Sequence, residues 1–173
     1  MRNLILCLAS VLLTASTPTV IDTPQVMQYA EQRLPHTGIL EKTKEGLVYL
    51  KVSDDYINAL LPLLKNNAVK APPYFGQGGI GAHVTLILPE EVDWSTHPQF
   101  PSWGTQIPFN ISHFVSVVPE GQPPFPYTQK VNKLYLITLE APALESLRLT
   151  AGLSPKILGR DFHITIGVEY AER

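Results

Sequence analysis

A strand–helix–strand pattern that occurs twice constrains the fold of this chain most strongly. The spacing of apolar residues predicts strand 46–52, helix 53–67 and strand 82–88 in the first unit, and strand 131–140, helix 142–150 and strand 161–168 in the second. A further strand region is predicted over 105–118, and a helix from Thr23 to Leu34. Strands dominate and do not alternate regularly with helices. The sequence therefore predicts an α+β fold with mostly antiparallel sheets rather than a doubly wound parallel fold.

The size and composition of the chain fit one compact domain that follows an N-terminal segment. The chain has 173 residues, of which 45% are hydrophobic, and this is enough for a sizeable core. Its net charge of −2 provides no broad basic field that would attract duplex DNA. We therefore expect the partner to be a small nucleotide or an RNA 3′ end rather than duplex DNA. We also expect the protein to be a monomer.

The N-terminus is typical of a secretory signal peptide. Arg2 supplies a positive charge, residues 4–13 are mostly apolar, and small residues follow. The apolar run is shorter than the roughly 20 residues that cross a bilayer. We expect a signal peptide over 1–17, a secreted or periplasmic domain over 18–173 and no stable membrane span after cleavage; a buried N-terminal helix is the alternative. Cys7 is the only cysteine, so the mature domain would have no disulfide and no thiolate nucleophile.

Two His-x-Thr sequences are the main candidates for chemistry. His83 and Thr85 lie in one predicted strand, and His163 and Thr165 lie in another. Side chains two residues apart in a strand point to the same face, so each histidine shares a face with its own threonine. If the two units pack around a pseudo-twofold axis, all four polar side chains meet in one cleft. A single His-x-Thr sequence is not specific for any function. Two copies that each follow a predicted strand and helix indicate a function.

This set of side chains suits the cleavage of a phosphodiester. The reaction needs a base for the attacking group and an acid for the leaving oxygen, and histidine serves as either because its ordinary pKa is near 6.5. Threonine hydroxyls can donate hydrogen bonds to the non-bridging phosphate oxygens. The predicted site is therefore a phosphate cradle that needs no metal and no cofactor. A zinc site formed by both motif histidines and a third histidine is an open alternative.

The paired motifs resemble those of the 2H phosphoesterase superfamily, the 2′,3′-cyclic phosphodiesterase-like proteins, over roughly residues 40–170. The resemblance implies a bilobal fold, with two pseudo-symmetric lobes of antiparallel sheet around a central cleft and helices outside. It also implies metal-free hydrolysis or transesterification of a 2′,3′-cyclic phosphate, in a cyclic nucleotide or at an RNA end, or of a related linkage. His83 and His163 would be the catalytic residues, and Thr85 and Thr165 would bind phosphate. The motif is symmetric, so it does not assign the acid and the base.

Four further residues are candidates for substrate contact: Tyr74, Phe75 and Tyr127 in Pro- and Gly-rich loops, and Arg160 just before the second motif. An aromatic ring in a loop can stack on a base, which is worth about 1–3 kcal/mol. The alternative for these rings is that they fill gaps in the core. Arg160 can pair with phosphate, and a surface role or a bond to Asp161 is its alternative.

Acidic residues at Glu90 and Glu91 follow the first motif, and they favour a small cyclic nucleotide or a terminal phosphate over long RNA. A second hypothesis belongs to another class of protein. It is a non-catalytic nucleotide- or phosphate-binding module that uses the same cradle. This hypothesis predicts saturable nucleotide binding that depends on Thr85 and Thr165, with no turnover.

Overall fold

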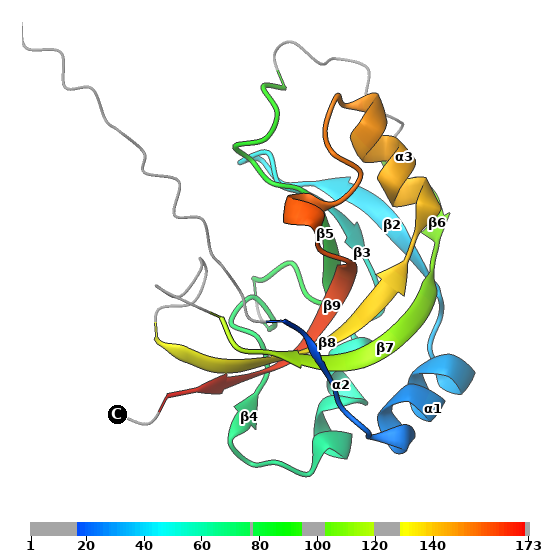
Figure 1. The fold of residues 1–173 in the computed structure, drawn as a ribbon. Helices are drawn as coiled ribbons and strands as arrows, with labels where there is room; N and C mark the ends of the chain where they lie inside the picture. Colours follow the sequence, from blue (N-terminus) through cyan, green and yellow to red (C-terminus); the bar gives the residue numbers. More distant parts are fainter. Residues whose placement is uncertain (1–16, 77, 95–102, 120–128, 172–173) are drawn as a thin grey trace, which may run out of the picture.

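The structure of the chain is a computed structural model that describes residues 17–76, 78–94, 103–119 and 129–171 (Figure 1). Residues 1–16 of the predicted signal peptide and the predicted loop over 120–127 lie outside this part. The elements are, in chain order, β1 (Thr19–Val20), α1 (Pro24–Arg33), β2 (Thr37–Lys42), β3 (Val48–Lys51), α2 (Asp55–Asn58), the 3-10 helix η1 (Leu61–Leu64), β4 (Val69–Lys70), β5 (His83–Ile87), β6 (Gln106–Pro108), β7 (Asn110–Val117), β8 (Val131–Glu140), α3 (Pro142–Thr150), the 3-10 helix η2 (Ile157–Gly159) and β9 (Phe162–Tyr170). No helix in the described residues is long and apolar enough to cross a membrane.

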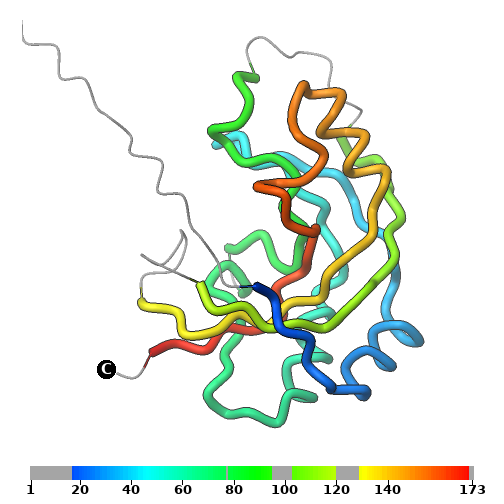
Figure 2. The backbone as a smooth tube through the Cα atoms, in the orientation of Figure 1, coloured from blue at the N-terminus to red at the C-terminus, as the bar shows by residue number. Residues whose placement is uncertain are grey.

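The described strands form one nine-stranded antiparallel sheet. Its order is β1-β7-β8-β9-β5-β3-β2-β6, and β4 pairs with the C-terminal part of β9. At its centre β5 pairs with β9, and β3 and β8 flank this pair on either side. Figure 1 shows that the sheet is strongly bent, and Figure 2 traces β5 and β9 running side by side. The predicted α+β class is confirmed, whereas the division into two lobes stays a prediction.

A proline shortens the helix of the first unit. The helix predicted over 53–67 consists of two short pieces, α2 and η1. Pro62 has no backbone N–H to donate to the carbonyl of Asn58, so a continuous α-helix cannot pass through this position. The corresponding helix of the second unit, α3, has its proline at the start and runs for nine residues.

Strand β2 is an element that the sequence did not predict, because Pro35 and Gly38 are typical of a helix end. Gly38 instead lies within β2, where this strand closely approaches β3. A Cβ atom at Gly38 would come within 2.6 Å of Leu50 Cγ and 2.7 Å of the Lys51 carbonyl oxygen. Glycine is therefore required here for close packing between strands.

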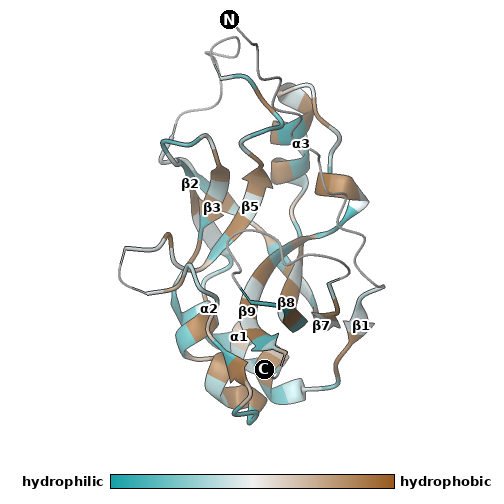
Figure 3. Ribbon diagram, turned by 90° about the vertical axis from the view of Figure 1, so that its left-hand side faces the viewer, coloured by the Kyte–Doolittle hydropathy of each residue, from teal (hydrophilic) through white to brown (hydrophobic). Residues whose placement is uncertain are grey.

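The helices pack on the face of the sheet that carries the main hydrophobic core. α2 contacts β9 and α3 contacts β5, so the helix of each unit packs on the central strand of the other unit. Val84 of β5 and Ile164 of β9 are fully buried in this core. Figure 3 shows hydrophobic stretches along β3 and β5. The opposite face of β5 and β9 is left for polar side chains.

A buried ion pair joins α3 to the end of β5. Arg148 is only 1% exposed, and its Nη1 and Nη2 donate to the two carboxylate oxygens of Glu91 at 3.0 and 2.7 Å. Nη1 also donates to the carbonyl oxygen of Leu86 at 2.6 Å, and Nε donates to that of Ser154 at 2.8 Å. These bonds satisfy the charge of Arg148 within the core.

Candidate active site

The pairing of β5 with β9 determines where the two motifs lie. The strands are antiparallel, and Val84 lies directly opposite Ile164. Both side chains point into the main hydrophobic core. Successive side chains of a strand point to opposite faces, so the residues on either side of Val84 and of Ile164 point to the other face of the sheet.

The four motif side chains therefore share one face of the sheet. In this register His83 lies across from Thr165, and Thr85 lies across from His163. Such cross-strand neighbours have Cβ atoms about 4.5–5.5 Å apart. The two histidines occupy one diagonal of a four-residue group, and the two threonines occupy the other. The structure thus brings both predicted His-x-Thr motifs together, with each histidine beside the threonine of the other motif.

The ring of His83 is held in one orientation. Its Nδ1 lies 2.8 Å from the carbonyl oxygen of Gly81. A carbonyl can only accept, so Nδ1 of the neutral ring carries the proton and Nε2 has the lone pair. The ring makes edge contacts with the rings of Tyr74 and Tyr49, at centroid distances of 4.6 and 5.7 Å. His83 is 8% exposed, and Nε2 is the nitrogen that can take up a proton.

His163 makes the same kind of bond. Its Nδ1 lies 3.1 Å from the carbonyl oxygen of Asp161, which is again two residues before the histidine. The neutral ring therefore has its lone pair on Nε2, as in His83. His163 is half-buried. The two histidines thus have matching tautomers on one face of the sheet.

Both histidines have a pKa below the ordinary value of 6.5. Burial lowers the pKa of His83 most, the bond to the Gly81 carbonyl raises it, and the positive charges of His163 and Lys51 lower it further. Burial also lowers the pKa of His163, where the Asp161 carbonyl raises it and Arg160 lowers it. Because the two rings repel each other when both are charged, the pair favours holding a single proton.

The threonines complete this face with two hydroxyl donors. Thr165 is 8% exposed and Thr85 is half-buried. The described residues contain no group of three or more His, Cys, Asp or Glu side chains placed to hold a metal ion. The face thus offers two hydroxyls that can donate hydrogen bonds to an anion such as phosphate, and two imidazoles that can donate from Nε2 when they are protonated.

Comparison with known families shows the class of the domain that carries this face. A family model described as "Swiss Army Knife, 2H phosphoesterase domain" matches residues 48–172, from β3 through β9. The chain belongs to the 2H phosphoesterases. The resemblance seen in the sequence is therefore confirmed, and the function of the chain is of the phosphoesterase type, a class of hydrolases. A search of curated proteins and a search of solved structures found no match.

One of the other predicted substrate contacts lies beside a motif residue of the 2H phosphoesterase domain. Tyr74 contacts the ring of His83. Phe75 is partly buried and packs against the main hydrophobic core, which agrees with the alternative that this ring fills a gap in the core. Arg160 is exposed on the surface, close enough for its charge to act on His163. Tyr127 lies outside the described residues.

Two residues of β3 reach the same face of the 2H phosphoesterase domain, although the sequence did not single them out. Tyr49 lies opposite Thr85, and Lys51 lies opposite His83. The Tyr49 hydroxyl donates to Glu41 at 2.6 Å, and burial together with this carboxylate raises the pKa of Tyr49 to about 12. The alternation within the predicted strand 46–52 indicates that Tyr49 and Lys51 point to the same face. The pairing of this strand with β5 was not readable from the sequence.

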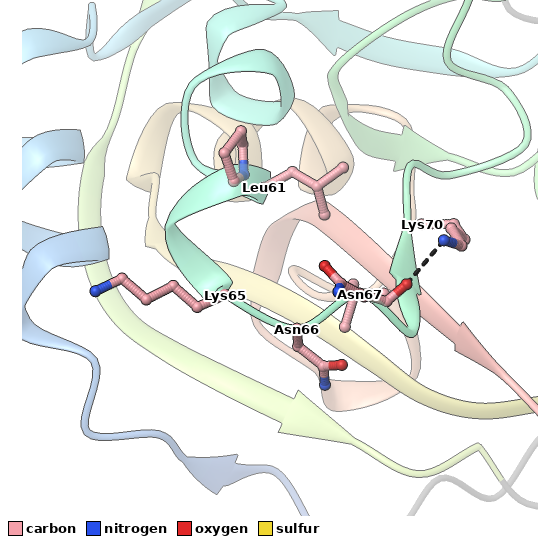
Figure 4. Close-up of a pocket in the computed structure, with 7 residues that line it drawn as sticks. Leu61, Lys65, Asn66, Asn67 and Lys70 are labelled. Atoms are coloured by element: carbon pink, nitrogen blue, oxygen red, sulfur yellow. Dashed lines mark hydrogen bonds between the residues drawn. The ribbon is translucent and has the colours of Figure 1, made fainter.

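A pocket of about 310 Å³ lies between η1 and β4 of the 2H phosphoesterase domain (Figure 4). Its polar lining consists of Lys65, Asn66, Asn67 and Lys70, and Lys70 Nζ donates to the carbonyl oxygen of Asn67 at 2.7 Å. None of the His-x-Thr residues lines it. Its lining contains no histidine and no carboxylate, so the pocket lacks the pair of groups for acid–base catalysis that the His-x-Thr face provides. The His-x-Thr face is therefore the candidate active site.

Proposed function

We propose that this 2H phosphoesterase is a metal-independent phosphodiesterase that hydrolyses 2′,3′-cyclic phosphates by two-histidine general acid/base catalysis. The cross-strand register supports this most, because it puts His83 and His163 diagonally across one face. Each ring has its Nδ1 bonded to a carbonyl and so offers Nε2 for proton transfer. Each ring also lies beside a threonine hydroxyl that can bind the phosphate.

The proposed reaction starts with one neutral and one protonated histidine. The neutral imidazole takes a proton from water while the water oxygen attacks phosphorus, and the bond from phosphorus to one ribose oxygen breaks. The protonated imidazole gives its proton to that ribose oxygen. The products are a phosphate monoester and a free ribose hydroxyl. The hydroxyls of Thr85 and Thr165 donate to the non-bridging oxygens, and the two histidines exchange protons with solvent before the next cycle.

The substrate that we propose is a small cyclic nucleotide or the cyclic phosphate at an RNA 3′ end. The net charge of −2 supports a short substrate, because binding of a long polyanion needs many cationic contacts. The negative charge of Glu91 adds little support for a short substrate, since both of its carboxylate oxygens are bound by Arg148. The proposal keeps the expectation of a monomer. It also keeps the secreted or periplasmic location, which rests on the N-terminal sequence pattern.

The four nucleoside 2′,3′-cyclic phosphates test the proposal. We expect the purified protein to convert at least one of them into a 2′- or 3′-monophosphate, which chromatography separates, and we expect EDTA to leave the rate unchanged. Loss of activity in EDTA with recovery in Zn²⁺ would favour the zinc alternative. Saturable nucleotide binding without turnover would favour the binding module. The absence of both binding and turnover would contradict the phosphate cradle.

A further inference from the structure

An ion pair beside the first motif holds the chain where it enters β5. Nζ of Lys51, on β3, donates to Oδ1 of Asp54 at 2.7 Å and to the carbonyl oxygen of Ile80 at 2.9 Å. The same Oδ1 of Asp54 accepts the backbone N–H of Ala82 at 2.9 Å. We call Lys51 and Asp54 the clip, because together they bond to the backbone on both sides of Gly81.

Gly81 lies inside the clip and has no room for a side chain. Its φ is +73°, in the left-handed region that favours glycine. A Cβ atom at this position would overlap Lys51 Nζ and the carboxylate of Asp54. The carbonyl oxygen of Gly81 is the atom bonded to Nδ1 of His83. The clip thus fixes the peptide that orients the ring of His83.

We propose that Lys51 and Asp54 are positioning residues for His83, holding Gly81 so that the ring keeps its proton on Nδ1 and presents Nε2 to the substrate phosphate. The inference rests on the proposed two-histidine function. Both residues act through the backbone of Gly81, and neither has to touch the substrate. The second motif has a different anchor. There Asp161 supplies the carbonyl, and its own carboxylate pairs with Lys156 at 2.6 Å.

Lys51 has a second, electrostatic effect on the same ring. The groups that face His83 are His163, Lys51 and the rings of Tyr49 and Tyr74. The positive charge of Lys51 adds to the effect of burial in lowering the pKa of His83. Replacing Lys51 with methionine is therefore expected to raise the pKa of His83 in addition to loosening its ring.

Steady-state kinetics of the full chain with a cyclic nucleotide test the positioning role. We expect Lys51→Met and Asp54→Ala each to lower kcat by about 10- to 100-fold, because a small misplacement of a reacting group has an effect of this size. KM should stay within about threefold, since the phosphate still binds the threonines. Asp54→Asn should recover most of kcat because its amide oxygen can still accept from Ala82. A raised KM with unchanged kcat in Lys51→Met would mean that Lys51 binds phosphate directly, and would overturn the proposal.

The ¹⁵N chemical shifts of His83 provide a readout that needs no turnover. The wild-type ring should be almost entirely protonated on Nδ1, whereas Lys51→Met and Asp54→Ala should show a mixture of tautomers. Lys156→Met is the matched control, because it removes a Lys–Asp pair near the other histidine and should leave the tautomer of His83 unchanged. If Asp54→Ala does not fold, Lys51→Met decides the test.

Two separate results distinguish the failure of this inference from the failure of the proposed function. Wild-type kcat and an unchanged His83 tautomer in folded Lys51→Met would overturn the positioning role. Full activity of His83→Ala would instead overturn the two-histidine function. In that case the tautomer of His83 still shows whether the clip orients the ring.

Discussion

Replacing His83 with alanine is expected to slow 2′,3′-cyclic phosphate hydrolysis by about 10²–10⁴-fold, because one of the two proton transfers loses its group. The same loss is expected for His163→Ala. Attack on phosphorus and departure of the ribose oxygen both depend on proton transfer, so the double variant should be little slower than either single variant. Initial rates on one cyclic nucleotide at fixed pH compare the three proteins.

His113→Ala is the matched control for these histidine variants. His113 lies exposed on β7, outside both motifs, with its Nδ1 at 2.7 Å from the hydroxyl of Ser112. We expect its replacement to leave the rate at the wild-type level. Circular dichroism and thermal unfolding check that the variants of His83 and His163 are folded. Full activity in a folded variant of either one would remove it from the proposed acid/base pair.

Replacing Arg148 with alanine is expected to lower the free energy of unfolding by about 3–5 kcal/mol. The variant leaves the carboxylate of Glu91 partly buried without its cation, and the carbonyl oxygens of Leu86 and Ser154 lose their donors. The variant also opens a cavity between α3 and β5. Urea unfolding followed by circular dichroism measures the difference.

Two comparisons show whether the loss comes from the buried pair. Arg33→Ala, at an exposed site in the last turn of α1, should change the free energy of unfolding by less than about 0.5 kcal/mol. The double replacement Arg148→Met with Glu91→Leu should recover part of the loss, because it removes both charges. A loss below about 1 kcal/mol in Arg148→Ala would contradict a structural role for the pair.

The same pair should make stability depend on pH. Burial raises the pKa of Glu91, but the bonds from Arg148 and from the Leu88 amide outweigh it and lower the pKa below the ordinary value of 4.5. A carboxylate with a lowered pKa in the folded state stabilises the fold above its unfolded pKa, and this contribution disappears as pH falls through the folded pKa. The wild-type protein should therefore lose more stability than Arg148→Ala as the pH falls through this acid range.

The sequence predicted the features of the site that follow from local rules. Period-two alternation put His83 with Thr85 and His163 with Thr165, and the matching frames suggested that the two pairs meet. Strand β8 has the predicted bounds, because six of its ten residues are apolar and no proline or glycine interrupts them. The diagonal arrangement of the histidines depends on the register between β5 and β9, which is a tertiary property.

The features that the sequence missed depend on contacts between distant segments. Gly38 is typical of a helix end in the sequence. In the structure it lies in β2, where the absence of a side chain allows the close approach of Leu50. The sequence did not single out Lys51 or Asp54, because nothing near them in the chain indicates that they bond to the backbone on both sides of Gly81. The sequence therefore indicated the groups that we propose to react, whereas the contacts of Lys51 and Asp54 around Gly81 were visible only in the structure.

An NMR titration of the His83 and His163 imidazoles tests most directly whether the two motifs form one phosphate site. In the free protein both rings should titrate below pH 6.5, because burial lowers both pKa values. Binding of adenosine 2′- or 3′-monophosphate should raise both values, since a nearby dianion favours the charged imidazole. Both rings should also report the same dissociation constant. A response from one ring alone, or from neither, would contradict the shared site.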